Sequence, residues 1–160
     1  MATDHKVVTC LWFDQDAEAA AKFYVSLLGD SRIGKISRYG KNGRMPEGLA
    51  MVVTFELAGT PYMALNGGPV YKLSEATSIV VQCADQAEID HLWSALTADG
   101  GKEIMCGWLT DRFGVSWQIV PAKIGEWMSN PDPKVGARVM AAFMSMKKLD
   151  IATLETAAKG

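Results

Sequence analysis

The stretch DAEAAAKFYVSL at residues 16–27 and the stretch DQAEIDHLWSAL at residues 85–96 carry the same residue types at the same offsets. Each begins with an aspartate, has a large apolar pair after two further turns of a helix, and ends on a leucine. Each follows a β-rich run, Val7–Phe13 and Ser78–Cys83. A strand–helix unit that is written twice indicates a duplicated module, and paired modules usually form a cleft where they meet.

The first module is predicted over residues 5–69. Its opening strand, Val7–Phe13, leads to a helix that either Asp14 or Asp16 can cap and that ends at Gly29. After that helix, β-type composition and turn residues predict three more strands, at Ile33–Arg38, Leu49–Leu57 and Tyr62–Leu65.

The second module is predicted over residues 76–121. Asp85 and Glu88 form a capping-box pattern, so a helix should start there and run to about Ala98. Two strands are expected after it, at Glu103–Leu109 and Ser116–Val120, and Pro121 ends the sheet.

Residues 122–160 read as a C-terminal helical extension of what is otherwise one domain over residues 1–160. Asp132 with Pro133 marks one helix start, and Asp150 marks a second. Methionine is concentrated in this part of the chain, and we expect the apolar stripe of the first of these helices to lie over the sheet or a neighbouring subunit.

Composition excludes several classes of function. With 16 basic and 18 acidic residues the formal net charge is −2, which gives no basic footprint for nucleic acid. No window approaches the roughly 18 apolar residues of a membrane span, and the first residues lack the apolar core of a signal peptide. The three cysteines fit reduced thiols, so we expect a cytoplasmic protein.

The run CGWLTDRFGVSWQIVP at residues 106–121 is the most specific motif of the chain. Here the sequence closely resembles the PhnB-like family, often labelled 3-demethylubiquinone 3-methyltransferase, of the vicinal-oxygen-chelate superfamily. The resemblance implies an α+β fold of paired βαβββ modules, the glyoxalase/bleomycin-resistance/dioxygenase fold, and a homodimer. Further matching segments are Leu11–Phe13, Phe23-Tyr24, Ile33–Gly40, Tyr62–Pro69, Arg138–Met140 and Met146–Ile151.

Metal enzymes of that superfamily take His, Glu or Gln ligands from the first and last strands of the two modules. Carried over to this chain, those positions fall on a set in which Gln118 alone is a plausible ligand. Divalent transition metals prefer imidazole, thiolate or carboxylate groups, and neither His5 nor His91 is placed to serve, so we expect no metal. The other positions in the set are Val8, Thr9 or Cys10, then Ser78, then Ala64 or Asn66.

The methyltransferase label would require S-adenosylmethionine. Most such enzymes bind it on a doubly wound sheet with a glycine-rich turn after the first strand. The residues that follow the first strand here, Asp14-Gln15-Asp16-Ala17, contain no glycine. We therefore expect no cofactor, and we interpret the label as a family name.

Strand alternation predicts an apolar, aromatic cleft with a few neutral amides and hydroxyls, which suits a flat or amphipathic organic ligand. The leading hypothesis is thus a metal-free protein that binds a small organic molecule. The alternatives are an enzyme, either glyoxalase- or dioxygenase-like or a methyltransferase, and a regulatory dimer with a vestigial cleft. Glu56 and Asp111 are the only candidate acid–base groups, and both are expected to face solvent. The candidate ligand-binding residues are Cys10, Trp12, Phe55, Asn66, Ser78, Gln82, Trp108, Ser116 and Gln118.

Overall fold

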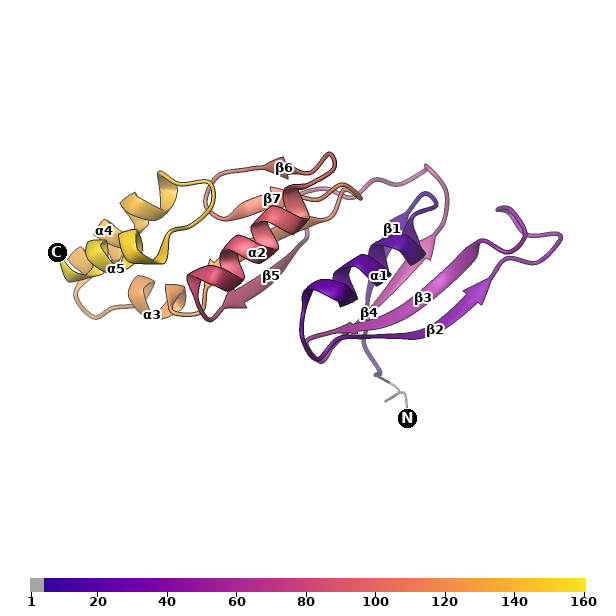
Figure 1. The fold of residues 1–160 in the computed structure, drawn as a ribbon, viewed down its shortest axis with the longest axis horizontal. Helices are drawn as coiled ribbons and strands as arrows, with labels where there is room; N and C mark the ends of the chain where they lie inside the picture. The colour runs from indigo at the N-terminus through magenta and orange to yellow at the C-terminus, as the bar shows by residue number, and fades with distance from the viewer. Residues whose placement is uncertain (1–4) are drawn as a thin grey trace. The chain divides into compact units, whose positions relative to one another are not determined.

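The computed structural model describes residues 5–160, which divide into two compact units at Leu73 and Ser74 (Figure 1). Every helix and strand of the first predicted module lies in the first unit. The second unit contains the second predicted module together with the C-terminal extension.

The first unit is a four-stranded sheet with one helix. Its strands lie in the order β1-β4-β3-β2, with β1 parallel to β4 and the other neighbours antiparallel. In chain order the elements are β1 (Thr9–Phe13), α1 (Ala17–Leu27), β2 (Arg32–Arg38), β3 (Ala50–Leu57) and β4 (Thr60–Asn66).

The second unit repeats this topology, with its sheet in the order β5-β8-β7-β6 and β5 parallel to β8. The prediction of an α+β fold built from two βαβββ modules is therefore confirmed. The elements of this module are β5 (Ser78–Cys83), α2 (Gln86–Thr97), β6 (Lys102–Glu103), β7 (Trp108–Thr110) and β8 (Ser116–Pro121).

One face of each sheet packs against the helix of its module. In the first unit the buried ring of Tyr24 on α1 lies 6.5 Å, centroid to centroid, from that of Phe55 on β3. In the second unit Trp117 and Ile119 of β8 are buried with Leu92 of α2. Because side chains alternate along a strand, the residues between these point to the opposite face, which we call the open face.

The two module helices start in different ways. The Asp85 side chain accepts a hydrogen bond from the backbone N–H of Glu88 at 2.9 Å, and the Glu88 side chain accepts one from Ala84 at 2.7 Å, which confirms the predicted capping box. Helix α1 follows no such rule: Asp16 is its N-cap residue, but no side-chain cap bond is formed. Instead the Asn66 side chain, on β4, accepts the N–H of Ala17 at 2.9 Å.

The strand predicted at Glu103–Leu109 is wrong as a single element, because the chain turns within it. Cys106 and Gly107 both have left-handed backbones, with φ of 62° and 78°. A Cβ at Gly107 would lie 2.7 Å from the carbonyl oxygen of Ile119, so only glycine fits this close approach. The result is two short strands, β6 and β7, in place of one.

The extension consists of three helices, α3 (Ile124–Met128), α4 (Pro133–Met144) and α5 (Ile151–Lys159). The caps predicted at Asp132 and Asp150 are confirmed, since their side chains accept the N–H groups of Lys134 and Thr153. The short helix α3 was not predicted. A shared core joins the extension to the module through Val120, Val139, Leu149 and Leu154.

Hydrogen bonds from two places in the second module also hold the extension. The side-chain amide of Gln86 donates to the carbonyl of Leu149 at 3.1 Å and accepts from the N–H of Ile151 at 2.8 Å. The N–H groups of Cys106 and Gly107 donate to the carbonyls of Met146 and Lys147. Among the described residues, no helix is long and apolar enough to cross a membrane.

Candidate open-face site of the second unit

Strand register places five of the predicted site residues on the open face of the second sheet. Gln118 of β8 lies between Val80 of β5 and Trp108 of β7, so these three side chains form one row across the sheet. The neighbouring rows are Ser78, Ser116 and Thr110 on one side, and Gln82 with Val120 on the other.

The polar centre of this face is the pair formed by Ser78 and Gln118. The Gln118 amide nitrogen donates a hydrogen bond to the Ser78 hydroxyl at 2.9 Å, and both residues are half-buried. This bond orients the amide and leaves its oxygen without a hydrogen bond to any described residue. A neutral acceptor is therefore held at a fixed place beside the Trp108 indole.

Ser116 adds a second polar group to the face. The residue is 2% exposed, and its hydroxyl oxygen has no hydrogen-bond partner among the described residues. An unpartnered buried hydroxyl costs free energy until a polar group reaches it. The third row is less enclosed on one side: Gln82 is exposed, whereas Val120 is only 6% exposed because the extension packs on it.

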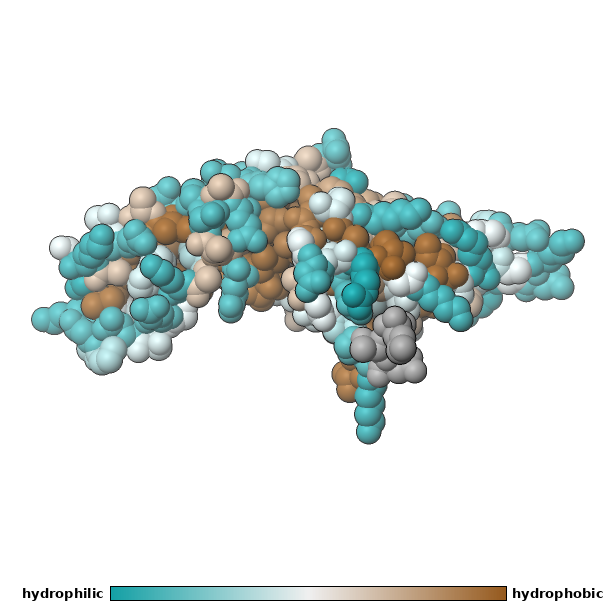
Figure 2. Space-filling view, turned by 60° about the horizontal axis from the view of Figure 1, so that its bottom comes forward, coloured by the Kyte–Doolittle hydropathy of each residue, from teal (hydrophilic) through white to brown (hydrophobic). Residues whose placement is uncertain are grey.

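The open face of the first unit carries Cys10 and Trp12, next to Met63 and Leu65 of β4. The Trp12 indole nitrogen donates to the carbonyl of Gly68 at 2.9 Å, and the ring meets Tyr71 edge-on with centroids 5.0 Å apart. A Cβ at Gly67 would lie 2.2 Å from this indole, so that glycine makes room for the ring. Figure 2 shows hydrophobic residues at the surface of each unit, bordered by hydrophilic ones.

Two of the predicted site residues lie elsewhere. Phe55 is 2% exposed and stacks on Tyr62 on the helix side of the first sheet, with ring centroids 5.5 Å apart. Asn66 is fully buried on the same side, where it accepts from Ala17 and donates to the carbonyl of Ala50 at 2.9 Å. Their expected cleft-facing position is therefore corrected: both belong to the core beneath the helix.

The two candidate acid–base groups are already engaged. The carboxylate of Glu56 forms an ion pair with Arg32 at 2.7 Å. Asp111 is 3% exposed, so its expected solvent-facing position is wrong. Its carboxylate accepts from the N–H groups of Phe113 and Val115 and from the indole of Trp117, which makes it the centre of the turn before β8.

The donor set of the second open face does not fit a divalent metal ion. Ser78, Ser116 and Gln118 offer neutral hydroxyl and amide oxygens, where transition metals prefer imidazole, thiolate or carboxylate. Among residues 5–160, no three His, Cys, Asp or Glu side chains gather in a way that could hold a metal ion. His91 is exposed on α2, and His5 lies 3.8 Å from Glu56 in the first unit.

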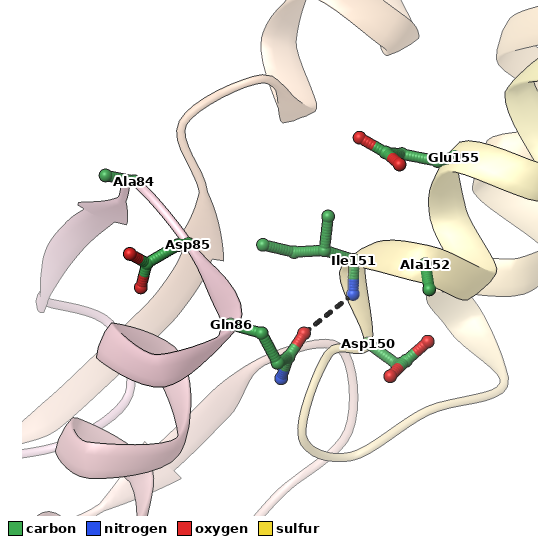
Figure 3. A pocket seen from close by; sticks show the side chains of 7 residues that line it. All are labelled: Ala84, Asp85, Gln86, Asp150, Ile151, Ala152 and Glu155. Atoms are coloured by element: carbon green, nitrogen blue, oxygen red, sulfur yellow. Dashed lines mark hydrogen bonds between the residues drawn. The ribbon is translucent and has the colours of Figure 1, made fainter.

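Sequence reasoning missed one pocket, of about 310 Å³, between the N-terminal ends of α2 and α5. In Figure 3 its acidic side chains, Asp85, Asp150 and Glu155, surround Ile151, whose N–H donates to Gln86. Two of these carboxylates serve as helix caps. The caps were predictable, but their convergence was not, because it depends on how the extension folds back.

Comparison with known proteins places the fold and then the family. Three solved structures match with TM-scores above 0.5. They are a PhnB protein from Bacillus cereus (36% identity, TM-score 0.69, 74% of this chain and 100% of that chain), protein PA1353 from Pseudomonas aeruginosa (23%, 0.61, 74% and 98%) and the fosfomycin resistance protein FosX from Listeria monocytogenes (13%, 0.55, 77% and 95%). A comparison with curated proteins found no match.

These likenesses and the doubled βαβββ topology define a protein of the glyoxalase/bleomycin-resistance fold, in the vicinal-oxygen-chelate superfamily. The chain belongs to the 3-demethylubiquinone-9 3-methyltransferase family, whose model matches residues 5–120. The extension from residue 121 onward lies outside that match. It is therefore an addition to the part of the chain that defines the family.

The family's name implies a methyl donor, and the residues present do not fit the usual site for one. Such a site needs a doubly wound parallel sheet with a glycine turn that opens a helix. Each sheet here has four strands with antiparallel neighbours, and the turn into α1 is Asp14-Gln15-Asp16. We derive no methyl-transfer step from this fold.

Proposed function

We propose that the chain is a small-molecule-binding protein, and that the open face of the second sheet is its binding surface. The observation that carries this proposal is the hydrogen-bonded pair of Ser78 and Gln118 beside Trp108. An oriented amide next to an aromatic platform can select a ligand by shape and by one hydrogen bond.

The chemistry of the face favours a flat or amphipathic organic molecule. Trp108 and Val80 offer apolar contact on either side of Gln118. The free amide oxygen would accept a hydrogen bond from a hydroxyl or N–H group of the ligand, and Ser116 could bind a further polar group. No cation stands on this face to hold a phosphate, so a neutral ligand fits best among the described residues.

Binding can be tested with a hydrophobic fluorescent probe, 8-anilinonaphthalene-1-sulfonate, and a panel of planar phenols and quinones that compete with it. Saturable binding should raise the melting temperature, because a ligand that binds only the folded state stabilises it. Gln118→Leu should weaken hydrogen-bonding competitors about tenfold, which is the cost of one unpaired polar group. Trp108→Ala should weaken all of them.

The matched control is His91→Ala, since His91 is exposed on the far side of α2 and should not affect binding. Equal affinities for the wild type, Gln118→Leu and Trp108→Ala would refute the assignment of the face. The first unit's pair of Cys10 and Trp12 is proposed as a second, less polar surface, and Trp12→Phe tests it in the same assay.

The enzyme alternative has less support, because both candidate acid–base groups have structural partners. A homodimer remains a prediction, based on the family and on the exposed methionines of α4, Met140 and Met144. Sedimentation should give a species of about twice the 17.3 kDa chain mass. A single species at the chain mass would refute the dimer.

A further inference from the structure

The junction between the second module and the extension brings two sulfur-bearing segments side by side. The backbone N–H groups of Cys106 and Gly107 donate to the carbonyls of Met146 and Lys147 at 2.7 and 2.8 Å. These bonds fix the 105–107 turn against the segment that follows α4. The arrangement is separate from the open face, which carries none of these residues.

At this junction the Cys106 thiol donates a hydrogen bond to the thioether sulfur of Met144, with 3.4 Å between the two sulfur atoms. The two residues are 38 positions apart in the chain, so their contact is created by the fold. Met144 is 58% exposed and Cys106 is half-buried, so a small ion can reach both sulfur atoms from solvent.

We propose that Cys106 and Met144 form a binding site for a soft monovalent metal ion of the Cu(I) class. Thiolate and thioether sulfur are the ligands that Cu(I) prefers over harder divalent ions. On binding, the Cys106 thiol releases its proton to solvent and its sulfur becomes a thiolate ligand. The Met144 sulfur contributes a lone pair, and the metal keeps its oxidation state.

The surroundings of the pair support this assignment. Met105 precedes Cys106 and is 42% exposed, and Met146 follows Met144 by two residues, so further thioethers stand next to both ligands in the chain. The other thiol of the second unit, Cys83, is fully buried, and burial raises its pKa to about 12. Cys83 is therefore no competitor for the metal near neutral pH.

The experiment measures Cu(I) affinity under anaerobic conditions, by competition with a chromophoric Cu(I) chelator, in a Cys10→Ser background that removes the exposed thiol of the first unit. We expect one equivalent to bind and to raise the melting temperature. Cys106→Ser should abolish this binding. Met144→Leu, which keeps the apolar volume, should lower the affinity about tenfold or more.

Met140→Leu is the matched control, because Met140 lies one turn earlier on α4 and is 46% exposed. It should leave the affinity unchanged. Circular dichroism and the metal-free melting temperature establish that each variant is folded. The proposal is overturned if Cys106→Ser still binds the ion, or if Met144→Leu and Met140→Leu have the same effect. Neither result bears on organic ligands at the open face.

Discussion

The carboxylate of Asp111 accepts a hydrogen bond from the indole nitrogen of Trp117 at 2.9 Å, and both residues are buried. The same carboxylate accepts two backbone N–H groups of the turn before β8, from Phe113 and Val115. A single charged group thus holds the turn, the strand and the largest buried side chain of the second unit together.

Asp111→Asn should lower the free energy of unfolding by about 3 kcal/mol, because an amide replaces an acceptor that serves three donors. Urea unfolding followed by circular dichroism measures this loss. Asp99→Asn, at an exposed position after α2, is the control and should cost less than about 0.5 kcal/mol. Equal stabilities would show that the buried carboxylate does not hold the turn.

Asn66→Ala should destabilise the first unit by about 2 to 4 kcal/mol, since it strands the N–H of Ala17 and the carbonyl of Ala50. Asn42→Ala, in the exposed loop between β2 and β3, is the control. Urea unfolding with fluorescence detection reports both. A small effect at Asn66 would mean that water can take its place.

The ion pairs of Glu18 should make stability depend on pH. Hydrogen bonds from Arg38 and then Lys22 lower the pKa of Glu18 to about 2, from an ordinary value near 4.5. Its stabilising contribution is therefore fully present above pH 4.5 and is lost as the pH falls toward 2. Because the site is on the surface, we expect at most about 1 kcal/mol.

The measurement for Glu18 is the difference in unfolding free energy between the wild type and Glu18→Gln at several pH values. This difference should be constant from pH 5 to 7 and should shrink below pH 4.5. A difference that persists at pH 2 would show that the carboxylate acts through something other than its charge.

Gly107→Ala should cost more stability than Gly114→Ala. Both glycines have left-handed backbones, with φ of 78° and 89°, so each alanine carries about 1 kcal/mol or more of backbone strain. Only at Gly107 would the new Cβ also meet the carbonyl of Ile119 at 2.7 Å and Leu149 at 3.0 Å. Thermal unfolding of the two variants compares them. Equal melting temperatures would contradict the close approach.

Local signals in the sequence predicted a large part of this fold. The caps at Asp85, Asp132 and Asp150 involve residues within three positions of each other, so composition alone identifies them. The strand–helix repeat predicted the module topology for the same reason. The cap of α1 was missed because its acceptor, Asn66, is 49 positions from the N–H that it binds.

The candidate site was predicted less well, because the side of a sheet to which a residue points depends on strand register. On β8 the predicted alternation agrees with the structure: Gln118 is on the open face and Ile119 is in the core. On β3 and β4 the opposite face was assigned to Phe55 and Asn66, and a shift of one residue is enough to exchange the two faces. Asp111 was misplaced because its turn folds back onto β8, which the sequence does not indicate.

The contrast between the two helix starts has a consequence for the order of folding. Helix α2 carries its own start signal, so its first turn can form from neighbouring residues at little entropic cost. Helix α1 receives its first acceptor only once β4 has closed a loop of nearly fifty residues. Two copies of one ancestral pattern can therefore mature on different timescales, with the second half of the chain able to nucleate first.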